Sequence, residues 1–274
     1  MEKSVKKLII KAKRKVFSEI PGNNPSIFRG EGFDFVELRE YQYGDDVKKI
    51  DWLISAKLQK PYVKIFKEER ELNVVLAAML DGGTYFGSRV LKRDQMVYIA
   101  ALIGFSAIKN RDRFCGFIFA DREYGFFKPT KSSAGVTRFC ESMGSFSPLG
   151  KTGNYDVMIE RLFRIKRRSL IFVLADFLDF SDMRVLARKH EVVAVIVRDE
   201  MEESPPELGF VTLLDPGGRE SMTMDLDSRV VSNYKKELKK RDFELYEHLK
   251  KAGIRFLKIY THDKPFAKLL RFFG

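Results

Sequence analysis

Apolar runs at three places in the chain predict strands that are buried on both faces. The runs lie at 73–80, 169–176 and 191–199. A strand covered on one face alternates apolar and polar residues, whereas a strand inside a parallel sheet is apolar at nearly every position. Segments that read as helices lie between the runs. We therefore expect an α/β fold with a doubly wound, mostly parallel sheet, right-handed crossovers and helices on both faces.

The segments around these runs predict the remaining elements of the main domain. A long helix should end near Ile108, and two further helices should cover 133–143 and 154–165. Two hairpins are expected, at 113–128 and at 210–225, the second turning at Pro216-Gly217-Gly218. The C-terminal part should form a basic helix at 229–252, a strand at 254–260 and a last helix after Pro265.

The N-terminal part has a different pattern. Residues 3–18 predict an amphipathic helix with lysines on one face, because apolar residues recur at helical spacing. Residues 26–70 are rich in aromatic and charged residues, with short alternating runs such as 62–66. We therefore expect a basic amphipathic helix at 1–20, a small β-rich module at 21–71 and the α/β domain at 72–274.

Composition limits the class of protein. The chain has 274 residues, 45% of them hydrophobic and 32% charged, which is typical of folded globular proteins. The longest uncharged stretch in its apolar middle, Gln95 to Ile108, is shorter than the roughly 20 residues of a membrane-spanning helix. Lysines interrupt any signal-peptide core. We expect a cytoplasmic protein with no transmembrane segment, in which Cys115 and Cys140 are reduced and buried.

The positive charge lies at the two ends of the chain. The formal net charge is +12, of which residues 1–20 carry +5 and residues 229–274 carry +8. Such basic ends fit an anionic partner, which could be nucleic acid, a membrane surface or an acidic protein face, but we favour helix faces that are simply solvated. Since the chain has neither an RNP-type aromatic motif nor zinc-finger spacing, binding of nucleic acid rests on charge alone, and we do not favour a nucleic-acid partner.

Catalytic and nucleotide-binding motifs are incomplete. Gly150-Lys151-Thr152 resembles the end of a P-loop, but Ser145 stands where that loop needs glycine. Asp81-Gly82-Gly83-Thr84 resembles the aspartate loop of haloacid-dehalogenase phosphatases, with Leu80 and Gly82 in place of its two carboxylates. G-x-S-x-G and H-E-x-x-H do not occur. The sequence therefore favours a protein that is not an enzyme.

The most specific pattern lies in the β-rich module. It comprises Arg29-Gly30-Glu31-Gly32-Phe33-Asp34-Phe35, Leu38-Arg39-Glu40-Tyr41, Gly44-Asp45-Asp46, Ile50-Asp51-Trp52, Ser55-Ala56-Lys57 and Glu68-Glu69-Arg70. Further matches follow at 174–177, 214–216, 260–263 and 269–272. Together these motifs resemble the bacterial and archaeal family called domain of unknown function 58, over nearly the whole chain. Its signature residues here are Arg29, Glu31, Arg39, Tyr41, Asp45, Asp46, Asp51 and Trp52.

The resemblance implies a fold and a function. It implies a von Willebrand A-like domain after an N-terminal β module, and a non-enzymatic partner of a MoxR-type AAA+ ATPase that helps to assemble or mature other protein complexes. The signature module alternates charges of opposite sign around Trp52 and Tyr41. We favour an internal ion-pair network that fastens the module to the main domain, and a partner surface is the alternative.

The same resemblance directs attention to a metal site. Related A domains hold Mg²⁺ with a D-x-S-x-S loop, a threonine from a second loop and an aspartate from a third, because this cation prefers a near-octahedral set of oxygen ligands. Here the D-x-S-x-S positions are Asp81, Gly83 and Tyr85, and Gly153 stands at the threonine position, one residue after Thr152. Of the expected ligands, Asp81 and Asp176 remain.

We therefore expect a degenerate site with no cofactor, in which these two carboxylates bind Mg²⁺ at most weakly through water. The crevice then becomes a candidate docking face for a partner, formed by Asp81, Thr84, Tyr85, Thr152 and Asp176. Two alternatives to an adaptor stay open. One is a module that binds nucleic acid or an anionic membrane through the basic terminal helices, and the other is a hydrolase that uses Asp81 and Asp176.

Overall fold

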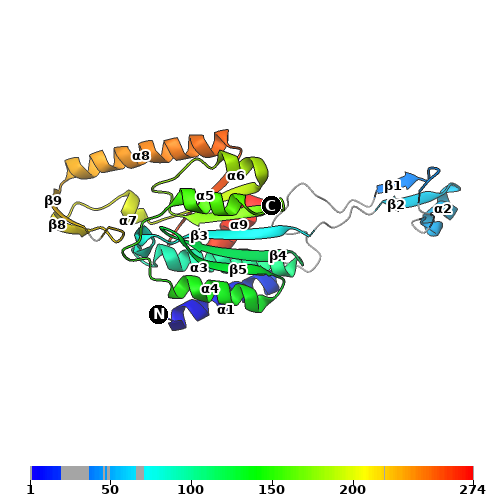
Figure 1. Ribbon diagram of the computed structural model, residues 1–274, viewed down its shortest axis with the longest axis horizontal. Coiled ribbons are helices and arrows are strands. Elements are labelled where there is room, and N and C mark those ends of the chain that lie inside the picture. Colours follow the sequence, from blue (N-terminus) through cyan, green and yellow to red (C-terminus); the bar gives the residue numbers. More distant parts are fainter. Residues whose placement is uncertain are drawn as a thin grey trace. The chain divides into compact units, whose positions relative to one another are not determined.

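The structure is a computed structural model that describes residues 2–19, 37–45, 47, 50–65, 71–218 and 220–273 (Figure 1). The chain divides into two units: residues 1–27 with 72–274, and residues 28–71. We describe each unit by itself.

A six-stranded sheet forms the centre of the large unit. Its strands are β3 (Asn73–Met79), β4 (Arg113–Phe119), β5 (Glu123–Thr130), β6 (Leu170–Ala175), β7 (Glu191–Arg198) and β10 (Arg255–Tyr260), in the order β10-β7-β6-β3-β4-β5. All neighbours are parallel except β4 and β5 at one edge. In chain order this is 6-5-4-1-2-3, so the strand order reverses between β3 and β6. The predicted fold class is confirmed.

Helices cover both faces of this sheet (Figure 1). One face carries α5 (Tyr155–Phe163), α6 (Arg184–Lys189) and α8 (Ser228–Lys251), and the other carries α3 (Lys92–Lys109), α4 (Ser133–Ser145) and α9 (Pro265–Phe273). Strand residues alternate between the two: Val75 and Ala77 join the core under α5 and α8, and their neighbours along β3 face the opposite side. Because both faces are covered, β6 is buried at every position, as its continuous apolar run predicted.

The N-terminal helix α1 (Glu2–Glu19) packs against α3 and α4 of the large unit. Val5, Ile9, Ala12 and Val16 are buried, at the helical spacing that predicted this amphipathic helix. Close approach to α4 depends on Gly144, because a Cβ there would lie 2.6 Å from both γ-carbons of Val5. The apolar stripe therefore attaches α1 to the same unit as residues 72–274.

A hairpin of β8 (Gly209–Leu214) and β9 (Ser221–Leu226) leads into α8. It follows the short helix α7 (Glu200–Glu203) and lies at the N-terminal end of α8 (Figure 1). This hairpin and the helix after it have nearly the predicted bounds.

In the small unit, β1 (Glu37–Glu40) pairs antiparallel with β2 (Tyr62–Ile65). Between them lies α2 (Trp52–Leu58), which the sequence analysis did not predict. The Asp51 carboxylate accepts hydrogen bonds from the backbone N–H groups of Leu53 and Ile54, at 3.0 and 3.2 Å, and thereby caps the helix N-terminus.

The sequence analysis also expected no membrane-spanning helix, and two cysteines that are reduced and buried. Among the described residues, no helix is long and apolar enough to cross a membrane. Cys115 and Cys140 are free and buried, as expected, and burial raises the pKa of the Cys115 thiol to about 12. A thiol with such a pKa is a poor nucleophile at neutral pH.

Gly144→Leu tests the packing of α1. The larger side chain forces α1 away from α4, so we expect the free energy of unfolding in urea to fall by about 1–3 kcal/mol. Ala134→Leu is the matched control, because Ala134 is exposed on the same helix and should change stability by less than about 0.5 kcal/mol. Equal effects of the two substitutions would contradict the described packing.

Candidate functional site

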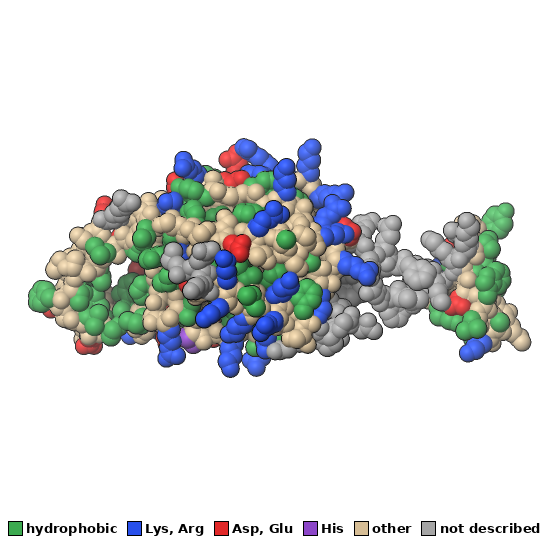
Figure 2. Space-filling model, turned by 90° about the horizontal axis from the view of Figure 1, so that it is seen from below, with side chains coloured by type: hydrophobic (Ala, Val, Ile, Leu, Met, Phe, Trp, Pro, Cys, Tyr) green, Lys and Arg blue, Asp and Glu red, His purple; other side chains and the backbone are tan. Residues whose placement is uncertain are grey.

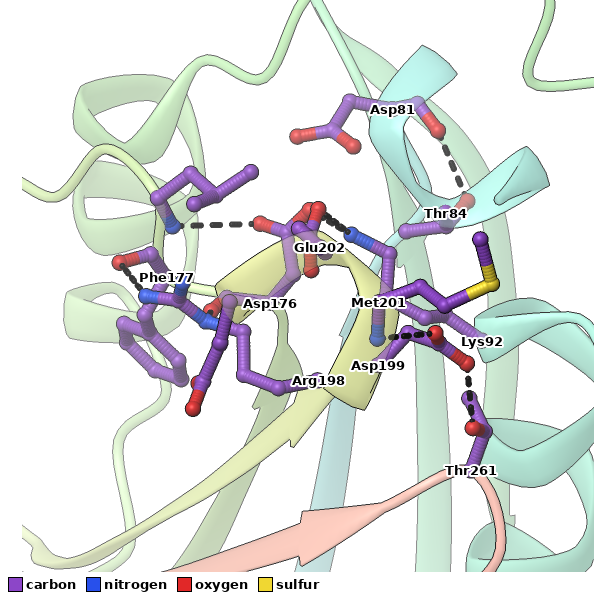
Figure 3. Close-up of polar contacts among 12 residues, drawn as sticks. Asp81, Thr84, Lys92, Asp176, Phe177, Arg198, Asp199, Met201, Glu202 and Thr261 are labelled. Carbon is purple, nitrogen blue, oxygen red and sulfur yellow. Dashed lines mark hydrogen bonds and ion pairs between the residues drawn. The ribbon is translucent and has the colours of Figure 1, made fainter. Parts of the chain in front are cut away.

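Two aspartates meet at the carboxyl edge of the central sheet. Asp81 follows β3 and Asp176 follows β6, and these two strands are parallel neighbours. The strand order reverses between them, and in open α/β sheets the loops at such a point separate to form a crevice. The structure therefore brings together the two carboxylates that the sequence placed there (Figure 3).

A lysine that the sequence analysis missed occupies this crevice. Lys92, the first residue of α3, is completely buried. Its ammonium donates hydrogen bonds to Oδ2 of Asp176 at 2.9 Å and to Oε1 of Glu202 in α7 at 2.6 Å. A buried charge is stable only when it is paired and hydrogen-bonded, so these two carboxylates hold the ammonium in place.

Burial and charge set the protonation states around Lys92. Burial, reinforced by the charge of Asp176, raises the pKa of Asp81 to about 8 although Lys92 acts in the opposite direction. Burial also raises the pKa of Glu202 despite the nearby ammonium. For Lys92, burial acts to lower the pKa, but the charges of Asp176 and Glu202 more than reverse this and leave it above its usual value. At neutral pH, Lys92 is therefore charged and Asp81 is mostly protonated.

Two glycines stand at the positions of missing metal ligands, and both are packed against carboxylates. A Cβ on Gly83 would lie 2.8 Å from Oδ2 of Asp176, and a Cβ on Gly153 would lie 2.8 Å from Oδ2 of Asp81. A side chain at either position would therefore require the neighbouring carboxyl group to shift. The carboxyl oxygens of the two aspartates fill the space into which a serine and a threonine would project.

The residues of this crevice do not fit Mg²⁺. Two of the three hydroxyl ligands are replaced by glycines packed against carboxyl oxygens and the third by Tyr85, and an ammonium lies beside Asp176 and Glu202. Within the described ranges, no three His, Cys, Asp or Glu side chains are grouped so that they could hold a metal ion. Mg²⁺ needs a near-octahedral oxygen shell, and this arrangement does not supply one.

Arg198 fixes the loop that follows β6. It is fully buried at the end of β7, and its guanidinium donates to the backbone carbonyls of Asp176 and Phe177 and, at 3.0 Å, to Oδ1 of Asp242 in α8. Phe177 has a φ of 53°, a left-handed conformation that is uncommon for a bulky residue. The arginine stabilises this turn and, through it, the position of Asp176.

The turn between β8 and β9 covers the crevice loops. The N–H of Gly150 donates to the carbonyl of Pro216 at 2.7 Å, and the N–H of Gly82 donates to the carbonyl of Lys151 at 2.8 Å. A Cβ on Gly82 would lie only 2.3 Å from the backbone nitrogen of Gly217. Three loops are therefore packed backbone to backbone, and the crevice is closed on this side.

The five residues predicted as a docking face divide into two groups. Thr84 and Asp176 are buried and Asp81 is partly buried, and the Thr84 hydroxyl donates to the carbonyl of Asp81 at 2.7 Å. Tyr85, which is 38% exposed, and Thr152 reach the surface. The Arg93 guanidinium lies over the Tyr85 ring at 5.7 Å. A partner that docks here contacts Tyr85 and Thr152 rather than the carboxylates.

The signature residues of the small unit are described in part. Arg29, Glu31 and Asp46 lie outside the described residues. Arg39 donates two hydrogen bonds to the Asp45 carboxylate, at 2.8 and 3.0 Å, and Asp51 caps α2. The remaining two signature residues are aromatic: Tyr41 is half-buried, and Trp52 is 68% exposed. An ion pair inside the unit is thus present, and the expected fastening to the main domain stays a prediction.

The sheet order and the paired carboxylates at the reversal point define a doubly wound α/β protein whose crevice contains a lysine. The chain belongs to the family described as Protein of unknown function DUF58, whose model matches residues 37–244.

Single proteins and solved structures resemble this chain at low sequence identity. The chain is 25% identical to the uncharacterized proteins Mb1516 of Mycobacterium bovis and Rv1480 of Mycobacterium tuberculosis, over 98% of this chain and 87% of theirs. A BatB protein of Bacteroides thetaiotaomicron is 11% identical, with a TM-score of 0.45 over 73% of this chain and 95% of that one. An aerotolerance-related membrane protein of Bacteroides fragilis is 9% identical, with a TM-score of 0.44 over 73% and 96%.

Asp81→Asn tests the buried carboxyl through the pH dependence of stability. The pKa of Asp81 is about 8 in the folded protein, whereas an unperturbed aspartate titrates near 3.9. Between these values the folded state keeps a proton that the unfolded chain releases, so the free energy of unfolding falls as the pH rises from about 4 to about 8. The amide of the Asp81→Asn variant has no such proton, and we expect a flatter profile in urea unfolding at about pH 5, 6.5 and 8.

Asp156→Asn provides the control for this measurement. Asp156 is an exposed carboxylate in the first turn of α5, and its removal should leave the wild-type slope unchanged. A profile of Asp81→Asn that runs parallel to wild type would show that Asp81 is ionised in the folded protein.

Proposed function

We propose that this chain is a non-catalytic adaptor that docks on a MoxR-type AAA+ ATPase and on client proteins during assembly or maturation of other complexes. The observation that carries the non-catalytic part is the closed crevice. Its charged side chains are paired with one another, Lys92 with Asp176 and Glu202, and the turn of the β8–β9 hairpin covers its loops. A hydrolase would need a reactive group that substrate can reach, whereas Asp176 is buried and paired with Lys92, and Asp81 is partly buried.

We also propose that the chain uses no cofactor and that it lies in the cytoplasm, where an ATPase partner has access to ATP. The partner itself comes from the family resemblance. Since the crevice side chains are mostly inaccessible, the docking surface should lie elsewhere on the large unit.

The β8–β9 hairpin is the surface that fits a protein partner best. Phe210 and Leu214 lie on one face of it and are 82% and 74% exposed, whereas Leu213 and Met222 form a cross-strand pair on the other face and are 45% and 63% exposed. Figure 2 shows hydrophobic side chains at the end of the large unit where this hairpin projects. Exposed apolar patches of this kind mark interaction sites, and the apolar chemistry favours a protein surface as the occupant.

A pull-down with a purified MoxR-type AAA+ ATPase tests this function. We expect wild type to retain the ATPase equally in Mg²⁺ and in EDTA when nucleotide is omitted, and Phe210→Ser with Leu214→Ser to reduce retention at least about tenfold, the scale of an interface hot spot.

Val185→Ser is the matched control, because Val185 is 47% exposed on α6, away from the hairpin. Undiminished retention by the hairpin variant would rule out this surface. Failure of wild type to retain the ATPase would reject the partner, and loss of retention in EDTA would reject metal-independent docking.

A second candidate function has a specific observation in its favour. The outward side of α1 presents Lys7, Lys11 and Arg14 together with Ile10 and Phe17, which are 53% and 47% exposed. Figure 2 looks onto this side of the large unit and shows many Lys and Arg side chains there. Basic residues interspersed with exposed apolar ones favour an anionic membrane surface over nucleic acid.

Flotation with vesicles that contain about 30% anionic phospholipid tests this candidate. Binding should weaken between about 50 and 200 mM salt, because such attraction is screened, and Lys7→Glu with Arg14→Glu should abolish it. Lys166→Glu with Arg167→Glu reverses two exposed charges elsewhere and should float like wild type. A wild-type protein that does not float at the lower salt eliminates the membrane function.

A further inference from the structure

We propose that one face of the β8–β9 hairpin, which we call its apolar face, binds a basic amphipathic helix of a partner protein. The strand register places five apolar side chains together on this face: Val211, Leu213, Met222, Met224 and Leu226. It lies opposite the face that carries Phe210 and Leu214, and its binding does not depend on the ATPase partner proposed above.

The pairing of side chains across the hairpin is the first argument. Residues that oppose each other in an antiparallel pair point to the same face of the ribbon. Val211 opposes Met224 and Leu213 opposes Met222, so both pairs on this face are apolar. On the opposite face, by contrast, every cross-strand pair contains a polar residue. A sheet face that is apolar throughout is normally covered by a second layer.

The exposure of the apolar face is the second argument. Leu226, just before α8, is 7% exposed, and Val211 and Met224 are half-buried. Nearer the turn, Leu213 and Met222 are 45% and 63% exposed. The apolar face is therefore covered at one end and open to solvent at the other. A two-stranded hairpin is marginally stable until a helix or further strands pack on it, so the open end is suited to a second layer from a partner.

The charge around the hairpin is the third argument. Residues 204–227 contain five acidic residues and one arginine, although the whole chain has a formal net charge of +12. All five acidic side chains are exposed, and within the described ranges none has an ion-pair partner. They are Glu207, Asp215, Glu220, Asp225 and Asp227. Such a rim repels anionic lipid and nucleic acid and attracts Lys and Arg. The partner segment is therefore basic as well as apolar.

The length of the hairpin sets the kind of segment that fits. Each strand has six residues, which at about 3.3 Å per residue span roughly 20 Å. An α-helix rises about 1.5 Å per residue, so a helix of about 13 residues covers the same length. Met222 and Met224 have flexible side chains that adapt to different apolar partners. The occupant is therefore a short helix with one apolar stripe that is flanked by Lys or Arg.

Three fluorescein-labelled model peptides of about 18 residues, each long enough to form such a helix, test the proposal with the full chain. The first carries leucine and lysine at helical spacing, the second has the same composition in strict alternation, and the third has glutamate in place of lysine at helical spacing. In fluorescence anisotropy we expect the first peptide to bind at least about tenfold more tightly than the other two, because it alone matches both the charge and the shape of the surface.

Substitutions on the two faces of the hairpin locate the binding. Leu213→Ser with Met222→Ser should weaken binding of the leucine–lysine helix at least about tenfold. Phe210→Ser with Leu214→Ser is the matched control on the opposite face and should change it by less than about twofold. The control is also the variant that should lose the ATPase, so failure of the adaptor function and failure of helix binding give different results.

Charge reversal tests the acidic rim. Glu207→Lys with Glu220→Lys should weaken binding of the leucine–lysine helix at least about fivefold and make the remaining binding less sensitive to salt. Asp156→Lys with Glu244→Lys reverses two exposed charges on α5 and α8 and should bind the peptide like wild type.

Several results would overturn the proposal. The leucine–lysine helix would fail to bind wild type, would bind the Leu213 and Met222 variant undiminished, or would bind no better than its glutamate counterpart. Tighter binding of the alternating peptide would show that a strand adds to the edge of the hairpin. Self-association of wild type in sedimentation, lost in the same variant, would assign the apolar face to a second copy of this chain.

Discussion

The ion pairs of Lys92 with Asp176 and Glu202 hold together the loops at the carboxyl edge of the central sheet. They join the start of α3, the end of β6 and α7, which are otherwise distant in the chain. Removing one member of a buried pair leaves a charge without compensation and is strongly destabilising, whereas the intact pair contributes little net stability. The pairs therefore act mainly to specify where three segments lie, and the loops of the crevice depend on that placement.

The crevice is closed on the side of the β8–β9 turn because the ion pairs fix these three segments and because glycines in the loops allow close packing. Gly83 and Gly153 let the carboxyl groups approach the backbone, and Gly82 lets the turn at Gly217 lie directly on the crevice loop. Arg198 completes the arrangement by donating to the carbonyls behind Asp176. Where the turn of the β8–β9 hairpin lies on the crevice loops, the crevice is closed, and the apolar hairpin lies beside it.

Much of the fold could be predicted from the sequence, because it depends on local patterns. The runs at 73–80, 169–176 and 191–199 became β3, β6 and β7 since a strand covered on both faces is apolar throughout. The juxtaposition of Asp81 and Asp176 followed from the rule that parallel strands end at the same edge. By contrast, α2 was missed because its main local signal is a single capping residue, Asp51.

The decisive residue of the site could not be predicted in the same way. Lys92 pairs with Glu202, 110 positions further along the chain, and no local pattern links the two. The only signal in the sequence was a lysine at the start of a predicted helix, where a positive charge is unfavourable. The adaptor role and the ATPase partner stay predictions, because they concern molecules that this chain alone does not describe.

The central claim is that an ammonium, and no metal ion, occupies the crevice. Anomalous scattering from crystals grown with about 10 mM MnCl₂, in excess of any chelating buffer component, tests it most directly. The account predicts the Lys92 ammonium within hydrogen-bond distance of both Asp176 and Glu202, with no manganese peak in the crevice. A manganese peak in contact with Asp81 or Asp176, with Lys92 displaced, would contradict it.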